Sequence, residues 1–409
     1  MRILESLQTE KWVNRLRIVV TIISVFSPFL AMYSTTISTI TFLDVAIGCS
    51  VVFILLTGQL RNTLKLKGLQ WWLLGAAILI GTNYLINMWG YSADLKVSVF
   101  LRCARYIMYL IYAGILLNDG LYDIKLGIRL FRIVSVFAAV YLLLQYLLLY
   151  VFDYSLPGYI TILPLMRAEL GTFTENLGAT FYARPRSIFA EPSSIGLFCG
   201  QYLVLSILFP VSKDKRWDTL EKVIIVAALA LSASSTALLA LAISAAIIAV
   251  KLINKSKKTA IVIIVAAVCL FVLLFGISDF FRDRVLYLIT RLPTSFMNRL
   301  GGFIEYGERV VNFSPFDIIF GIGMDISNMV EWYSGLIKIL LYFGVIGLVF
   351  FCLFVWKVLF VARIKHRAYL VFFLLFCVFS EVLVNSWLVL FLPIVLRDLD
   401  AQLINGTFS

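Results

Sequence analysis

The amino-acid sequence predicts an all-α, polytopic integral membrane protein, with residues 1–409 forming one membrane domain of about twelve transmembrane helices. Hydrophobic residues make up 62% of the chain and charged residues only 14%, and the mean hydropathy is +0.98. This composition is typical of a membrane-embedded chain and excludes an ordinary soluble globule. Apolar runs of nearly bilayer-spanning length also recur along the chain, and short basic segments alternate with them.

Each apolar run predicts one helix. In chain order, the predicted helices cover residues 17–34, 39–59, 69–89, 97–118, 131–152, 187–210, 221–233, 236–252, 259–278, 334–356, 369–384 and 386–397. The first run has no small-residue cleavage site after it, so we expect it to remain as an anchor. The cysteines all lie in apolar segments without disulfide or metal-site spacing, which argues against thiol chemistry.

Basic residues indicate the orientation of the helices. They cluster near residues 61–67, 125–129, 213–216, 255–258 and 363–367, and the positive-inside rule places all five segments in the cytoplasm together with the basic N-terminus. An even number of spans returns the C-terminus to the cytoplasm, in agreement with Arg397 at the end of the last predicted helix. This topology accounts for the net charge of +12, so we do not expect nucleic acid as a partner.

Two outer segments are much longer than turns, at residues 153–186 and 279–333. Both contain aromatic residues and prolines, and neither has the Gly/Ser composition of a flexible linker. We therefore expect both to form small folded caps over the helices.

Arginine dominates the basic residues of the predicted outer side. Only Lys96 and Lys338 are lysines there, and ten are arginines: Arg102, Arg105, Arg167, Arg184, Arg186, Arg282, Arg284, Arg291, Arg299 and Arg309. A guanidinium group grips phosphate oxygens with a planar fork and stays charged when partly desolvated, which favours an anionic outer ligand. The alternative is that individual loop arginines pair with outer acids, namely Glu169, Glu175, Asp283, Glu305 and Glu308.

Arg102 and Arg105 lie three residues apart, on one face of the fourth predicted helix. An arginine costs about 2.5 kcal/mol or more at the bilayer centre and less near the interface, so both should face a polar cavity or snorkel to the headgroups. Glu381, in the eleventh predicted helix, is a possible internal partner for one of them.

The run Arg184-Pro-Arg-Ser-Ile-Phe-Ala-Glu-Pro-Ser193 places two arginines and a glutamate at the outer edge of the sixth predicted helix. Pro192 fits a first helical turn, where its missing N–H costs little. Glu191 then has two possible roles. It is either a cap stabilised by the helix dipole, or a general base beside phosphate-binding arginines.

This run resembles the start of the helix that follows the first large outer loop in bacterial O-antigen and capsule polymerases of the Wzy type. Two further passages are similar to that family: Asn312-Phe-Ser-Pro-Phe-Asp-Ile-Ile-Phe-Gly-Ile-Gly-Met-Asp325, with its proline followed by Gly-x-Gly, and Tyr333-Ser-Gly-Leu-Ile-Lys-Ile-Leu-Leu-Tyr-Phe-Gly-Val-Ile-Gly347. Some members have an arginine, ten residues and a glycine in each loop, a spacing that Arg167 with Gly178 and Arg291 with Gly302 share. The order of the motifs extends the resemblance over most of the chain.

The resemblance implies a membrane glycosyltransferase of the bacterial cytoplasmic (inner) membrane. In such an enzyme, a hydroxyl of one repeat unit attacks the anomeric carbon of a chain linked to undecaprenyl diphosphate, and the diphosphate leaves. A chain-length regulator protein is a possible partner. We expect Glu191, Arg186 and Arg184 to be catalytic, and Arg102, Arg105, Arg167, Arg291, Arg299 and Arg309 to bind the diphosphate or the glycan. The outer segments contain no Asp-x-Asp pair or histidine–carboxylate cluster, so we expect no metal or other cofactor.

Two rival functions stay open. An O-antigen ligase of the same superfamily carries a functional histidine in its large outer loop, whereas the single histidine here, His366, lies in a predicted cytoplasmic loop. A flippase or transporter of lipid-linked oligosaccharide would be expected to show internal repeats and broken helices with charge near the midplane. A purely structural scaffold would not need ten outer arginines.

Overall fold

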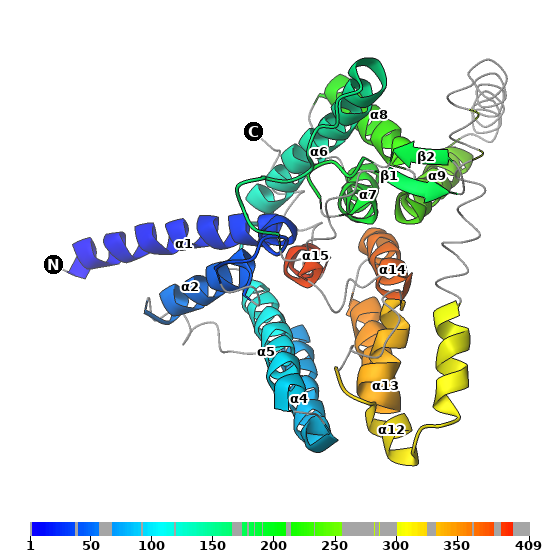
Figure 1. Ribbon diagram of the computed structural model, residues 1–409. Coiled ribbons are helices and arrows are strands. Elements are labelled where there is room, and N and C mark those ends of the chain that lie inside the picture. The colour runs from blue at the N-terminus through cyan, green and yellow to red at the C-terminus, as the bar shows by residue number, and fades with distance from the viewer. Residues whose placement is uncertain are drawn as a thin grey trace. The chain divides into compact units, whose positions relative to one another are not determined.

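The computed structural model is mainly helical (Figure 1). It describes residues 2–36, 40–56, 68–90, 93–117, 120–165, 174–177, 180–183, 185–189, 191–209, 214–232, 234–255, 301–324, 333–361, 364–379 and 386–395, with the isolated residues 282 and 286. Within these residues, five helices are long and apolar enough to cross a membrane: Trp12–Leu30, Leu69–Gly90, Lys96–Leu116, Ile124–Leu149 and Gly335–Phe360. By length and composition, they indicate a membrane-embedded protein.

The chain divides into two compact units. Unit 1 comprises Met1–Phe131, Ile162–Ala168 and Arg299–Ser409, and unit 2 comprises Arg132–Thr161 and Glu169–Asn298. Each unit therefore combines segments that are distant in the sequence, and one helix, α6 (Ile124–Phe152), contributes its first residues to unit 1 and the rest to unit 2.

Unit 1 holds most of the helices. Besides the start of α6 and a helical stretch at residues 301–310, they are α1 (Arg2–Leu30), α2 (Phe42–Leu56), α4 (Leu69–Asn87) with the 3₁₀ turn η1 (Met88–Gly90), α5 (Ala93–Leu116), α12 (Pro315–Phe320), α13 (Gly335–Val361), α14 (Ile364–Phe379) and α15 (Trp387–Val395). Helices α4 and α5 lie side by side, and α12 packs on α13 (Figure 1).

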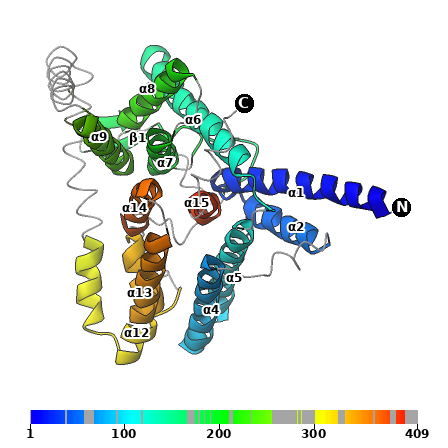
Figure 2. The same cartoon turned by 180° about the vertical axis from the view of Figure 1, so that it is seen from behind.

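Unit 2 is built on the remainder of α6, the strands β1 (Thr174–Leu177) and β2 (Thr180–Ala183), and the helices α7 (Pro192–Leu208), α8 (Lys215–Leu231) and α9 (Ser235–Lys255). Helices α7 and α9 lie side by side (Figure 2). A Cβ on Gly196 would lie 2.5 Å from the backbone nitrogen of Ala237, and one on Gly200 would lie 2.5 Å from Cβ of Ala240. Small residues one turn apart thus allow the two helices to approach closely, as in membrane helix pairs.

Several helices begin at residues other than those that hydropathy predicts. Helix α6 begins at Ile124 and not at residue 131, because the carboxylate of Asp123 accepts a hydrogen bond from the Leu126 N–H. Helix α8 begins at Lys215 and not at residue 221, because Asp214 caps it in the same way. The helical caps thus lie in the polar flanks, which a hydropathy window does not include.

The loop expected near residues 363–367 is wrong for four of these five residues, while their cytoplasmic side stays a prediction. Residues 364–367, among them His366, form the first turn of α14. Helix α1 likewise begins at Arg2 and not at residue 17, since no glycine or proline interrupts residues 2–16. The ninth predicted helix, at residues 259–278, lies outside the described residues.

The tenth predicted helix, at residues 334–356, corresponds to α13, and this helix is broken at Gly344. This glycine has φ +61° and ψ −156°, which is not helical. The two long segments that are predicted to lie outside are described in part. The first contains the antiparallel hairpin β1–β2, and the second contains the helical stretch 301–310 and α12. The hairpin is a departure from the purely helical fold that hydropathy predicts.

Candidate functional site

The turn before α7 is held in a strained conformation by α6. Ser187 has φ +59°, a left-handed value that costs on the order of 1–3 kcal/mol outside glycine. Gln145 of α6 accepts a hydrogen bond from the Ser187 N–H at 2.8 Å and donates to the Ser187 carbonyl at 3.2 Å. The Ser187 hydroxyl donates to the carbonyl of Ala138 at 2.6 Å. These bonds fix the backbone next to Arg186.

Arg186 is buried, with 3% of its surface exposed. Its guanidinium carbon lies 5.3 Å from the centre of the Tyr159 ring, at the distance of a cation–π contact. Gly158, beside Tyr159, packs against the same turn. A Cβ on Gly158 would lie 2.4 Å from the Ser187 carbonyl oxygen and 3.1 Å from Nε of Arg186. The positive charge of the Arg186 guanidinium group is therefore surrounded by protein, where an electrostatic interaction is stronger than in water.

Glu191 is the last residue before α7, with extended backbone angles and Pro192 at the first helical position. Its side chain makes no hydrogen bond to the helix backbone, so it does not cap the helix as a serine or aspartate does. The carboxylate accepts a hydrogen bond from the Ser193 hydroxyl at 2.9 Å, and the residue is partly exposed. A partly exposed carboxylate that is oriented by a hydroxyl can accept a proton from a substrate.

In unit 1, the Gly-x-Gly segment packs into the break of α13. Ser314 and Asp317 form a capping box that starts α12, which ends at Gly321 with φ +80°. A Cβ on Gly321 would lie 2.4 Å from the Tyr342 carbonyl, and one on Gly344 would lie 2.4 Å from the Ile319 carbonyl. Only glycines permit this approach, which brings together two motifs that are separate in the sequence.

Helices α4 and α5 fasten this segment in place. The side-chain amide of Asn83 donates to the carbonyls of Phe320 at 2.7 Å and Tyr342 at 2.8 Å, so it bridges the two sides of the contact. Arg102 donates through Nη1 to the Met324 carbonyl at 2.7 Å. One function of Arg102 is therefore to hold the backbone that follows Gly-x-Gly.

Arg105 forms an ion pair with Asp44 of α2, with 3.0 Å between Nε and Oδ2. The Asp44 carboxylate also accepts hydrogen bonds from the Tyr109 hydroxyl at 3.0 Å and the Thr41 N–H at 2.8 Å. Within the described structure Arg105 thus pairs with Asp44, whereas Glu381 lies outside the described residues. A charge on α5 is compensated locally within unit 1.

Arg309 pairs with Glu305 one turn earlier, at 2.6 Å between Nη2 and Oε1. Such pairing is the alternative to ligand binding for a loop arginine, and about a third of the Arg309 side chain stays exposed at 35%. Nearby, burial and the Glu305 carboxylate raise the pKa of Tyr333 to about 12, so this hydroxyl is protonated at neutral pH.

Four further predicted site residues lie outside the described residues: Arg167, Arg184, Arg291 and Arg299.

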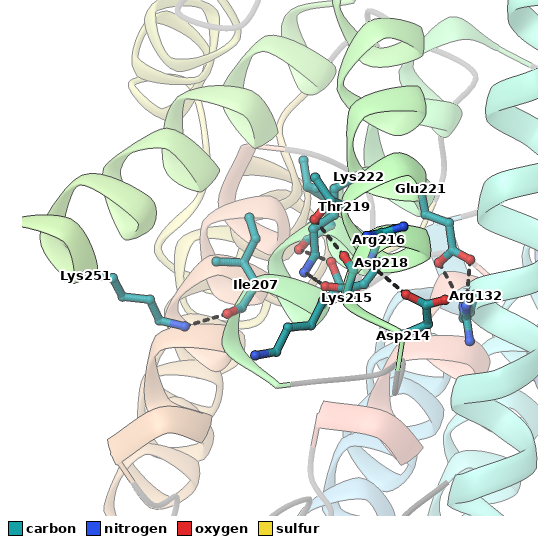
Figure 3. A network of polar contacts seen from close by, with 12 residues as sticks. Arg132, Ile207, Asp214, Lys215, Arg216, Asp218, Thr219, Glu221, Lys222 and Lys251 are labelled. Atoms are coloured by element: carbon teal, nitrogen blue, oxygen red, sulfur yellow. Dashed lines mark hydrogen bonds and ion pairs between the residues drawn. The ribbon is translucent and has the colours of Figure 1, made fainter. Parts of the chain in front are cut away.

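A second polar network lies at the start of α8, where Arg132 of α6 binds Glu221 (Figure 3). Both bonds are short, 2.8 Å from Nε to Oε2 and 2.6 Å from Nη2 to Oε1, which is the bidentate fork geometry. Lys222 pairs with Asp218 on the same helix. The predicted topology places this network at the cytoplasmic side, and it fixes α8 to α6 within unit 2.

Sequence reasoning missed the residues that position these groups: Gln145, Tyr159, Gly158, Asp44 and Asn83. Gln145 and Asn83 carried a usable signal, because a polar amide inside an apolar helix must find a partner when it is buried. Asp44 carried one too, in the Thr41-x-x-Asp44 spacing of a capping box. Nothing in the sequence indicates that Tyr159 lies under Arg186.

No protein-family model and no curated protein matches this chain.

Proposed function

We propose that this protein is a membrane glycosyltransferase that polymerises undecaprenyl-diphosphate-linked oligosaccharide repeat units into O-antigen, capsule or a related surface polysaccharide. The reaction takes place at the outer face of the bacterial cytoplasmic membrane. The observation that carries the proposal is the turn before α7, where a strained backbone holds a buried arginine five residues before a carboxylate that does not cap its helix.

The residues of this turn suit the chemistry of glycosyl transfer from a diphosphate. A hydroxyl oxygen of one repeat unit forms a bond to the anomeric carbon of another, the bond from that carbon to the phosphate oxygen breaks, and the diphosphate leaves with the electron pair. Arg186 neutralises the negative charge that accumulates on the leaving group, an effect that is largest where water is excluded. Glu191 takes the proton of the attacking hydroxyl.

The proposal includes the finer topology. With twelve spans, two large extracytoplasmic segments and cytoplasmic termini, the turn before α7 lies at the outer surface, where lipid-linked repeat units are available. Arg102, Arg105, Arg167, Arg184, Arg291, Arg299 and Arg309 are proposed to contact the diphosphate or the glycan, and a chain-length regulator protein is proposed to act as partner.

One observation favours a second candidate function, transport of lipid-linked oligosaccharide. Transporters bind their substrates at broken helices, and α13 is broken at Gly344 where α12 and Gly321 pack against it. The ligase alternative has less support, because residues 364–367 place the single histidine in α14 and not in a large outer segment.

Surface glycan profiling of a deletion strain separates these functions. Loss of polymerisation leaves a single repeat unit attached where long chains are normally found, and this is the expected result. Loss of all attached glycan would instead indicate a ligase or a flippase. Long chains of unchanged length would rule out the polymerase.

A further inference from the structure

The start of α13 is a cluster of polar groups that the proposed reaction does not use. Ser334 directly precedes Gly335, the first residue of α13, and the Lys338 N–H donates to the Ser334 carbonyl at 3.0 Å, so Ser334 is the residue from which the helix starts. The first N–H groups of a helix have no partner within it and carry the positive end of the helix dipole. A serine in this position normally accepts one of these N–H groups with its hydroxyl.

The hydroxyl of Ser334 does not do so. The residue is 2% exposed, and its Oγ has no hydrogen-bond partner within the part of the chain that the structure describes. Leaving a buried hydroxyl without a partner costs about 1–3 kcal/mol. The cost is removed when a ligand with acceptor oxygens takes the hydrogen bond that the hydroxyl can donate.

Lys338 adds a positive charge on the same face, because it lies four residues after Ser334. A lysine near the end of a membrane span normally extends its ammonium group to the headgroups. Lys338 is instead 7% exposed and is covered by protein. Its charge therefore acts inside the protein, one turn from the helix start, at the end of the span Gly335–Phe360.

One acid that the structure describes near this cluster, Glu305, has a partner of opposite charge. The helical stretch 301–310 packs on the start of α13, since a Cβ on Gly302 would lie 2.8 Å from Cδ1 of Tyr333. Glu305 of that stretch is paired with Arg309 at 2.6 Å, so its negative charge is balanced. The positive helix start therefore favours an anion at the unpartnered Ser334 hydroxyl, and Lys338 adds a basic residue one turn later.

We propose that the start of α13, formed by Ser334, the N–H groups of the first helical turn and Lys338, binds the phosphate group of a membrane lipid. A phosphate oxygen can accept hydrogen bonds from the Ser334 hydroxyl and from backbone N–H groups at a helix start, and Lys338 contributes positive charge. The position at the end of a membrane span suits a lipid, because a headgroup phosphate lies at that depth while its chains lie along the helix. The binding is independent of catalysis at the turn before α7.

Native mass spectrometry of the full-length protein tests this site without turnover. The protein is released from detergent micelles in the presence of undecaprenyl phosphate, phosphatidylglycerol, diacylglycerol or inorganic phosphate, and bound adducts are counted. Ser334→Ala removes one oxygen atom, Lys338→Met removes the charge at similar length, and Lys357→Met removes an exposed lysine from the other end of the same helix as a control.

We expect Ser334→Ala and Lys338→Met each to weaken binding of a lipid phosphate about tenfold or more, as the loss of a hydrogen bond or charge to an ionised group requires. Lys357→Met should bind like the wild type. If the two substitutions weaken the binding of undecaprenyl phosphate alone, the site is supported and its ligand is a polyprenyl phosphate. If they weaken the binding of both undecaprenyl phosphate and phosphatidylglycerol, the site is a general headgroup site. Weakened binding of inorganic phosphate supports the phosphate chemistry with a free anion as its source.

Two results would overturn the proposal. One is that every variant binds undecaprenyl phosphate and phosphatidylglycerol as tightly as the wild type does. This includes Ser334→Ala, whose small change preserves the fold. The other is binding of diacylglycerol as tight as that of phosphatidylglycerol, because a lipid without phosphate cannot use this site. Neither result bears on glycan polymerisation, which the deletion strain tests separately.

Discussion

Arg186 combines two properties that a membrane protein rarely places together, a permanent charge and almost complete burial. The Tyr159 ring below its guanidinium and the close approach of Gly158 explain how unit 2 accommodates it. Because the turn around Ser187 is strained and held by Gln145, the backbone next to the arginine is fixed by the fold itself. Preorganised charge of this kind stabilises a developing anion without the cost of rearrangement.

Replacing Arg186 by lysine keeps the charge but removes the planar fork. We expect Arg186→Lys to lower polymerisation about tenfold or more while the protein still accumulates in the membrane. Chain-length distribution and membrane abundance are measured together, with Arg216→Lys at the exposed start of α8 as the control. Normal chain lengths from Arg186→Lys would remove this residue from the proposed site.

Glu191 allows a separate test, since Ser193 is its hydrogen-bond donor. Glu191→Gln removes the proton acceptor at nearly constant size and should reduce the polymerisation rate by about 10²–10⁴-fold. Ser193→Ala only frees the carboxylate and should have a much smaller effect. Equal, mild effects of both substitutions on rate, with a lowered thermal midpoint, would show that Glu191 serves the helix start and not the reaction.

At the level of elements, the break in α13 explains why two motifs with glycines at fixed spacing occur in this chain. Gly321 ends α12, Gly344 interrupts α13, and each leaves room for the backbone of the other segment. Asn83 then bonds to a carbonyl on either side. Irregular backbone at membrane depth is stable only when such partners satisfy its polar groups.

Gly344→Ala should therefore destabilise the protein by several kcal/mol, because the residue has φ +61° and a Cβ would meet the Ile319 carbonyl at 2.4 Å. A Cβ on Gly301 meets nothing within 4 Å, so Gly301→Ala is the matched control and should be neutral or stabilising by up to about 1 kcal/mol. The thermal midpoint of purified protein measures both. Similar midpoints for the two variants would contradict the tight packing described for this contact.

Within unit 2, the ion pair between Arg132 and Glu221 joins α6 to α8 (Figure 3). Its side chains are 27% and 14% exposed, so water screens it only in part. Hydropathy places both residues at the edges of spans, but no pattern in the sequence pairs these two among the basic and acidic residues near them. The pairing follows from the way α8 packs on α6.

For the whole molecule, the described helices support a membrane-embedded protein, and the predicted orientation can be tested directly. An even number of membrane spans puts both termini on the same side, and the basic loops place that side in the cytoplasm. A fluorescent protein fused to the C-terminus should then fluoresce, while alkaline phosphatase fused there should stay inactive. A fusion near residue 155, in the first long outer segment, should give the opposite pattern, and identical patterns at both positions would refute the predicted topology.

Local properties of the chain were sufficient to predict the membrane class, the approximate positions of most helices, and the run from Arg184 to Ser193 as a place of interest. About 20 apolar residues must cross the bilayer and charge must stay near its edges, so these features are visible in short windows of sequence. The partners, in contrast, are known only from the fold: Tyr159 for Arg186, Asp44 for Arg105, Met324 for Arg102, and Gly321 for the break at Gly344. Such partners come from segments that are not adjacent in the sequence, so their contacts depend on packing and have no local pattern.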